Sequence, residues 1–273
     1  MRNCWVAILL LVSALSLAAQ EFTDSQWLAL RPPRIIFSAE LGYSQVRDSY
    51  LSPVTYDGPH FSVGLEHHQV AGFGHGRWVR QLNVDFAYDY GTNPAGNHHE
   101  HTLMVEARWS PMRRWDNALW HQVSVSVGPM IGARGGAIYN PHNSNNVVAG
   151  HGHLAIGAQG SAEWSTHLWR RTIDLRYQAT VPVVGVFFSP DYDEAYYEIY
   201  LGNHSGLAHC GWWGNRLDLG HSITADVHLG STILRLGYRG TWHRSDVNHL
   251  KARTMSHSLV IGLGGDFLSV KLR

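Results

Sequence analysis

The sequence predicts an all-β fold: an up-and-down antiparallel transmembrane β-barrel of about ten strands. Apolar residues alternate with small or polar ones along most of the chain, and Trp or Tyr often ends the apolar face. The alternating segments run for about ten residues, whereas soluble strands average about 5–6. The length of these segments and the aromatic residues at their ends therefore favour a membrane barrel over a soluble sandwich.

Composition excludes several other classes of protein. The 273 residues carry 21 Lys+Arg against 21 Asp+Glu, so the chain lacks the basic excess of a nucleic-acid binder. Aromatic residues make up 11% of the chain, with 11 Trp and 12 Tyr, which argues against disorder. Beyond the first 20 residues no apolar run reaches the length of about 18 that a helical span needs. The predicted partners are outer-membrane lipid and a small solute, and no cofactor is predicted.

The first residues predict an export signal. A short basic start, Met1–Asn3, precedes an apolar run, Cys4–Leu17, and small residues follow it at Ala18 and Ala19. This order indicates a cleaved signal peptide over residues 1–20. We expect a periplasmic segment over 21–32 and the barrel over 33–273, in the outer membrane of a Gram-negative cell. After cleavage Cys210 is the only cysteine, so no internal disulfide can form.

The first five alternating segments fill the chain up to residue 127. They are Ile35–Tyr43, Phe61–Leu65, Leu82–Tyr90, Leu103–Trp109 and Val123–Val127. Because successive side chains on a strand point to opposite faces, each segment has one apolar and one small or polar face. Each is therefore predicted to be a strand with one face in lipid.

Five more segments follow the same rule: Leu154–Trp164, Ile173–Val181, Leu217–Val227, Leu234–Trp242 and Leu259–Leu263. Twelve strands remain an alternative. Gly264–Asp266 could turn the chain and make Phe267–Leu272 a separate strand, and part of 186–201 could pair. Pro129 and Pro182 interrupt the pattern, and each predicts a bulge or the emergence of a strand from the membrane, because proline cannot donate to the ladder.

The polar faces carry too much charge for a soluble core. Their charged residues are Glu40, Glu66, Asp85, Glu106, Arg108, Glu163, Asp174, Arg176, Asp218, Asp226, Arg235 and Arg239. A barrel lumen accommodates such residues, and we expect acids and arginines to pair across it. The apolar faces end in aromatic residues that would form girdles at the two membrane interfaces: Tyr43, Trp78, Tyr90, Trp109, Trp164, Trp169 and Trp242.

Long and short connections alternate along the chain. The predicted long ones are 45–58, 91–99, 135–150, 183–214 and 244–253. The predicted short ones are 70–76, 110–119, 165–168 and 228–231. With ten strands both termini fall on the side of the short turns, which is the periplasmic side in outer-membrane barrels.

Two motifs resemble an uncharacterised family of exported bacterial proteins. One runs from Asp48-Ser49-Tyr50-Leu51-Ser52-Pro53 to Tyr56-Asp57-Gly58, and the other from Tyr196-Tyr197-Glu198-Ile199 to Leu201-Gly202-Asn203. Trp213, Asn215-Arg216, Arg235–Tyr238 and Asn248–Leu250 are similar to a third block. The resemblance extends from about residue 35 to about residue 265. It implies an outer-membrane barrel of unknown activity and supplies no catalytic residues.

The two motif segments also predict a site at the barrel mouth. Both fall in predicted long connections, yet they are rich in Tyr, Pro, Leu and Asn rather than in solvated charge. We expect them to fold over the mouth, either as a structural closure or as part of a ligand site. The candidate ligand-binding residues are Tyr50, Tyr56, Tyr196, Tyr197, Asn203 and Arg216.

Two further kinds of site are weaker candidates. Among the 19 His, His151 and His153 share one strand face, as two metal ligands would, although amphipathic histidines near the membrane rim explain the pattern more simply. Asp191 or Asp193 with His209 could activate water, the chemistry of an outer-membrane hydrolase of protease or lipase type. Polar lumen residues are required by the architecture itself, so the sequence favours a protein that is not an enzyme and no resident metal.

The function that the sequence predicts is that of an integral outer-membrane barrel with a narrow or occluded lumen. Barrels of about eight strands are filled by side chains, while wide aqueous channels need about 16–18. We therefore expect one of three roles: a structural role, the binding of a ligand, or porin-like passage of a small solute. The alternatives are the hydrolase and a soluble exported β-sandwich that binds a ligand.

Overall fold

The computed structural model describes residues 32–119, 121–143, 146–168, 171–192, 194–202 and 205–266. The predicted signal peptide, Trp169 and the possible extra strand Phe267–Leu272 lie outside these ranges. The elements, in chain order, are β1 (Arg34–Asp48), β2 (Ser52–Val70), β3 (Trp78–Thr92), β4 (His99–Trp115), β5 (Val123–Tyr139), β6 (Val148–Leu168), β7 (Arg171–Phe188), α3 (Tyr196–Tyr200), β8 (Ala208–Trp212), β9 (Arg216–Leu229), β10 (Thr232–Val247) and β11 (Leu250–Asp266).

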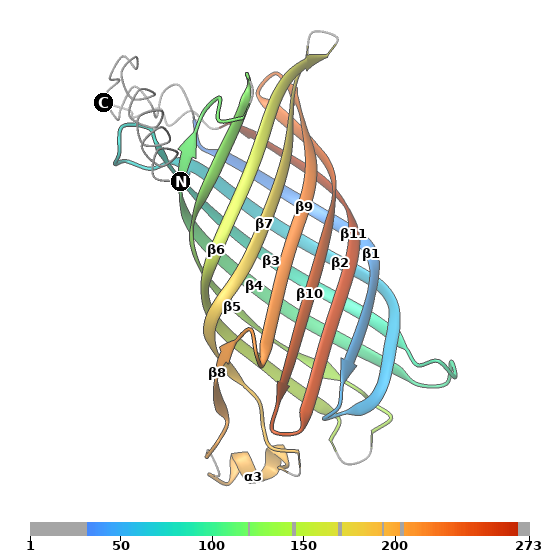
Figure 1. Cartoon of the computed structure of the whole chain (residues 1–273). Helices are drawn as coiled ribbons and strands as arrows, with labels where there is room; N and C mark the ends of the chain where they lie inside the picture. Colours follow the sequence, from blue (N-terminus) through green and yellow to red (C-terminus); the bar gives the residue numbers. More distant parts are fainter. Residues whose placement is uncertain are drawn as a thin grey trace, which may run out of the picture.

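Ten strands form one closed antiparallel barrel (Figure 1). Each pairs with its neighbour, the β6–β7 ladder continues the ring, and β1 pairs with β11 to seal it. The five-residue strand β8 pairs only with the end of β7 and stays outside the ring. The prediction of about ten strands is confirmed, since the ring closes with ten of the described strands.

The strands are longer than the sequence predicts, because the nine or more residues needed to cross a bilayer are only part of each one. Ring strands have 14 to 21 residues. The predicted long connection 45–58 is wrong, since β1 runs to Asp48 and β2 begins at Ser52. The connection 244–253 shrinks to Asn248 and His249, both of which adopt positive φ. Hydrophobic alternation fades where both faces of a strand meet water, so it misses these extensions.

The outward face of the ring is apolar. Its exposed side chains include Phe37 at 63%, Leu259 at 68% and Leu263 at 59%. No helix among the described residues is long and apolar enough to cross a bilayer. A soluble sandwich would bury such side chains between two sheets, whereas here they surround a single ring with a polar interior. An apolar wall around a closed polar lumen is the arrangement of outer-membrane barrels, and the chain is one.

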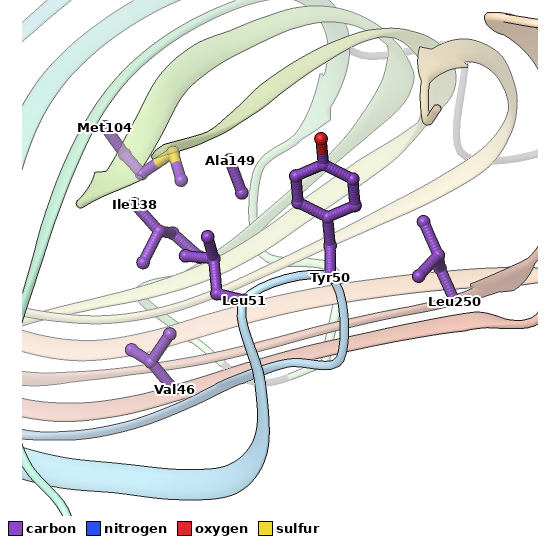
Figure 2. Close-up of a cluster of buried hydrophobic side chains, with 7 residues drawn as sticks. All are labelled: Val46, Tyr50, Leu51, Met104, Ile138, Ala149 and Leu250. Carbon is purple, nitrogen blue, oxygen red and sulfur yellow. The ribbon is translucent and has the colours of Figure 1, made fainter. Parts of the chain in front are cut away.

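Two clusters of buried apolar side chains lie near the two ends of the lumen. One cluster consists of Val46, Tyr50, Leu51, Met104, Ile138, Ala149 and Leu250, drawn in Figure 2. A smaller one, Val70, Val79 and Met112, lies near the turn between β2 and β3. Between these clusters most of the buried side chains of the described residues are polar or charged.

Pro182 causes the bulge that the sequence predicts. Ile156 on β6 pairs with Val184, and the next residue pairs with Pro182, so Val183 is left over. Near Pro129 the ladder between β4 and β5 is interrupted, and the Ser110 hydroxyl donates to the Pro129 carbonyl oxygen instead. Both prolines thus fall where a ladder hydrogen bond is missing.

Candidate functional site

A charged network crosses the middle of the lumen. The Glu66 carboxylate on β2 accepts hydrogen bonds from Arg176 on β7, at 2.7 Å, and from Arg235 on β10, at 3.1 Å. Arg235 also donates to Asp226 on β9 at 2.7 Å. All four side chains are buried. Because β2 and β7 are not neighbours in the ring, these bonds cross the interior rather than run along its wall.

A layer of amides lies beside these charges. Gln159 on β6 donates to Gln81 on β3, and Gln81 donates to Gln178 on β7, each at 3.0 Å. Arg176 donates to the Gln81 side-chain oxygen at 2.6 Å, which joins the amides to the charges. We call Glu66, Gln81, Gln159, Arg176, Gln178 and Arg235 the lumen network.

Further ion pairs extend the lumen network in both directions. Towards the chain termini, Arg34 lies 3.4 Å from Asp174 and 3.2 Å from Asp266. Towards the other end, Asp85 forms ion pairs with Arg108, at 2.8 Å, and with Arg239, at 2.7 Å. The predicted pairing of acids with arginines across the lumen is therefore confirmed.

A hollow opens at the end of the barrel that carries α3. Its empty space, together with the open solvent at its entrance, amounts to about 750 Å³. We call it the mouth pocket, and define it by six of its lining residues: Tyr50, Arg134, His151, His153, Tyr196 and Arg216. A second hollow of about 780 Å³ lies deeper, and Arg134 lines both. The second is called the middle hollow.

Two predicted mouth residues hold the entrance together. Tyr50 lies in the turn between β1 and β2, and its hydroxyl donates to the Glu194 carbonyl oxygen at 3.0 Å. Its ring meets that of Tyr196 edge to face, with centroids 5.5 Å apart. The Tyr196 hydroxyl accepts a hydrogen bond from the Gly150 amide. Burial raises the pKa of Tyr50 to about 12 and also raises the pKa of Tyr196, so both hydroxyls stay protonated at neutral pH.

The other predicted mouth residues are dispersed, except for Arg216. Arg216 lines the pocket and donates to Asp218 at 2.7 Å. Tyr56 is buried on β2 and accepts from Asn140 at 3.1 Å, behind the pocket wall. Tyr197 points to solvent with 69% of its surface exposed, and Asn203 lies outside the described residues.

His151 and His153 both line the mouth pocket, but each faces a carboxylate. His151 Nε2 lies 2.9 Å from Asp48, and His153 Nδ1 lies 3.4 Å from Asp218. His243 approaches Asp218 as well, at 2.8 Å. Within the described ranges no group of three or more His, Cys, Asp or Glu is arranged to hold a metal ion.

The hydrolase candidates have separate partners. Asp191 is exposed, and its amide donates to the Glu194 carboxylate at 3.3 Å. His209 Nε2 lies 3.1 Å from the Ser189 carbonyl oxygen and 3.2 Å from the Asn248 amide. Asp193 lies outside the described residues. The structure therefore brings no carboxylate of this set to His209 in the part of the chain it describes.

Arg134 is a lumen residue that sequence reasoning missed. The glycine-rich stretch around it was expected to belong to the connection 135–150, but β5 continues to Tyr139. One signal could have found it. Ile131, Ala133 and Ala137 alternate with Gly132 and Arg134, which places the arginine on the polar face.

Several solved barrels are similar to this chain in outline. The translocator domain of the autotransporter NalP from Neisseria meningitidis is 10% identical, with a TM-score of 0.40; the match covers 92% of this chain and 100% of that one. The beta domain of the Bordetella autotransporter BrkA is 11% identical over 86% of this chain and 100% of that one, with a TM-score of 0.42. The outer membrane protease OmpT from Escherichia coli is 7% identical over 86% of this chain and 96% of that one, with a TM-score of 0.39.

No curated protein matches the chain. A family model does match, and it covers residues 5–273, which include every strand of the barrel and the mouth pocket. The chain therefore belongs to the family described as protein of unknown function DUF3316.

Proposed function

We propose that this protein is an occluded outer-membrane barrel that binds a small ligand in its mouth pocket and does not conduct solutes in the state described. The observation that carries the proposal is the contact of Glu66 with Arg176 and Arg235 across the lumen. A hollow open to solvent lies on the α3 side of these bonds. A closed middle below an accessible pocket suits binding better than passage.

The energetics support this choice. Breaking a buried ion pair by removing one partner costs about 3–5 kcal/mol. A solute crossing the lumen would have to separate Glu66 from two arginines and also disrupt the amides around Gln81. Ligands bound at the mouth pocket need none of these contacts to break.

We further propose that the two motif segments are signatures of the family and serve this mouth. Asp48 accepts a hydrogen bond from the Tyr50 amide at 2.9 Å, which fixes the turn between β1 and β2. That turn then packs on Tyr196, the first residue of the second motif. The contact between the two segments supports a shared role in shaping the pocket.

Planar-bilayer recording tests the occlusion. The wild-type barrel should show no steady conductance, whereas the double variant Glu66→Ala/Arg176→Ala should open steps of conductance, since it removes one charge of each sign and leaves Arg235 paired with Asp226. Asp246→Ala/Lys251→Ala removes an exposed rim pair and is the matched control. Steady conductance by the wild-type protein, equal to that of the double variant, would overturn the proposal.

We also propose that residues 1–20 are removed on export. The support is the order of basic, apolar and small residues at the start of the chain. Mass spectrometry of protein purified from outer membranes should give a first residue near Gln20 or Glu21, and an intact Met1 would contradict this.

A further inference from the structure

We propose that the ligand of the mouth pocket is an oxyanion, a small solute bearing a phosphate or carboxylate group, and that Arg134 is the residue that binds it. This inference rests on the proposed function and adds the chemistry of the ligand.

Arg134 is placed in the lumen by the register of β5. It lies opposite Glu106 on β4 and opposite His153 on β6. Its guanidinium makes no hydrogen bond and no ion pair within 4 Å to any described residue, and it lines both hollows. Arginine presents five N–H donors in a fixed fork, so a lumen arginine without a protein partner has its full donor set available.

The other arginines that face the lumen behave differently. Each has at least one carboxylate partner: Arg34, Arg108, Arg114, Arg176, Arg216, Arg235 and Arg239. In a lumen built on paired charges, Arg134 is the exception among the described residues. A lumen arginine with no carboxylate within 4 Å is costly for the fold, which is the situation expected of a residue whose partner is a ligand.

The nearby carboxylates are already engaged. Glu106, directly opposite Arg134, lies 3.5 Å from Arg108. Asp218 is held by Arg216 at 2.7 Å and by His243 at 2.8 Å. The protein therefore supplies no free acid to Arg134 from these two positions, and an external oxyanion can take that place.

Charge around the mouth pocket favours an anion. Four arginines line it, Arg134, Arg216, Arg244 and Arg253, against one carboxylate, Asp48. Arg216 and Arg244 have acidic partners that do not line the pocket, Asp218 and Asp246, whereas Arg134 and Arg253 have no carboxylate within 4 Å among the described residues. A cleft lined by one sign of charge raises the local concentration of ions of the opposite sign. The guanidinium fork also matches the two oxygens of a carboxylate or phosphate group.

The balance reverses below Arg134. The middle hollow is lined by three arginines and by five carboxylates, Glu40, Asp85, Asp89, Glu106 and Asp218. An anion that enters the mouth pocket therefore meets repulsion beyond the level of Arg134. This change from mostly basic to mostly acidic lining places the anion at the level of Arg134. It also explains why an anion would bind there without crossing the lumen.

The test uses the full-length barrel, refolded in a nonionic detergent free of lipid and phosphate. Inorganic phosphate and succinate are titrated separately by isothermal calorimetry. The wild-type protein should bind at least one of them, and Arg134→Gln should weaken that binding by about tenfold or more. Arg134→Lys should fall between the two, because it keeps the charge and loses the fork.

Arg80→Gln is the control for loss of charge, since Arg80 is exposed on β3 and bonds only Gln69 outside the pocket. It should bind like the wild type. Arg134→Gln leaves no protein group without a partner, so it should fold, which heat-modifiable migration on gels verifies.

Equal binding by the wild type and Arg134→Gln would overturn the inference, as would no binding of either anion up to about 10 mM. Binding that requires phosphatidylglycerol in the micelle would overturn the free solute in favour of a lipid headgroup. The bilayer recordings separate the two proposals. A closed wild-type barrel with unchanged Arg134→Gln binding refutes only the role of Arg134, whereas a conducting wild-type barrel refutes the occlusion.

Discussion

Glu66 and Arg176 are 110 residues apart in the chain, yet their side chains meet across the lumen at 2.7 Å. The contact joins β2 to β7, two strands that share no ladder. A second arginine, Arg235, reaches the same carboxylate from β10. Three separate parts of the ring are thus tied together through one glutamate, which makes Glu66 the centre of the lumen network.

Substitution of Glu66 should be strongly destabilising. Glu66→Gln leaves Arg176 buried without its carboxylate, and removing one partner of a buried pair costs about 3–5 kcal/mol. The free energy of unfolding in urea, measured in lipid vesicles, checks this. Asp246→Asn, which affects only exposed pairs with Arg244 and Lys251, should cost less than about 1 kcal/mol. Equal losses in the two variants would refute the central place of Glu66.

The outward wall should reject charge. Ile261 is 56% exposed and lies midway between Leu259 and Leu263 on the apolar face of β11. Ile261→Arg should therefore cost about 2–4 kcal/mol in a bilayer, as arginine does near the midplane of other barrels. Ile261→Ala serves as the control for lost side-chain size. An arginine variant as stable as the alanine variant would mean that this face meets water.

The seam between β1 and β11 should tolerate no added methyl group at Gly42. A Cβ atom there would overlap the His257 carbonyl oxygen and the Ser258 backbone on β11. Gly42→Ala should cost about 1–3 kcal/mol, the usual range for overpacking, and should lower the folded fraction on gels. Gly72, in the turn after β2, has nothing within 4 Å of such an atom. Gly72→Ala should consequently fold like the wild type, and a normal yield of Gly42→Ala would contradict this account of the seam.

The mouth should loosen at alkaline pH. The pKa of Tyr50 rises from its usual value near 10 to about 12 on burial, so the folded state binds that proton more tightly than the unfolded state. Its contribution to stability is complete below about pH 10 and is lost as pH rises towards 12. Tyrosinate absorbance and urea unfolding across this window measure the effect. Tyr50→Phe keeps the ring contact with Tyr196 and should show a shallower decline; a slope identical to that of the wild type would disprove it.

Much of the barrel could be predicted because lipid on one side and a polar lumen on the other impose a strict period of two. That pattern locates Phe37 outside and Glu40 inside without any knowledge of the partner strands. It fails above the membrane, where Ser245 and Ala252 still pair although both strand faces there meet water. The sequence therefore predicts strands that stop short of their observed ends, and two predicted long loops, 45–58 and 244–253, are tight turns.

The mouth pocket was harder to predict than the fold. Tyr50 and Tyr196 could be singled out by the composition of their segments, but their contact depends on how the ring brings the two segments together. Arg134 was lost because a run of glycines hides strand alternation. Its lack of a partner becomes visible only once the surrounding acids, such as Asp218, are seen to be taken.

The pairing of β1 with β11 has a consequence for biogenesis. That ladder runs from Arg34 opposite Asp266 to Asp48 opposite Ala252, so sealing requires a strand whose last residue is 266. Until β11 joins, the sheet has two bare edges, β1 and β10, and such edges readily pair with other chains. Closure of the ring must therefore be the last step of barrel assembly.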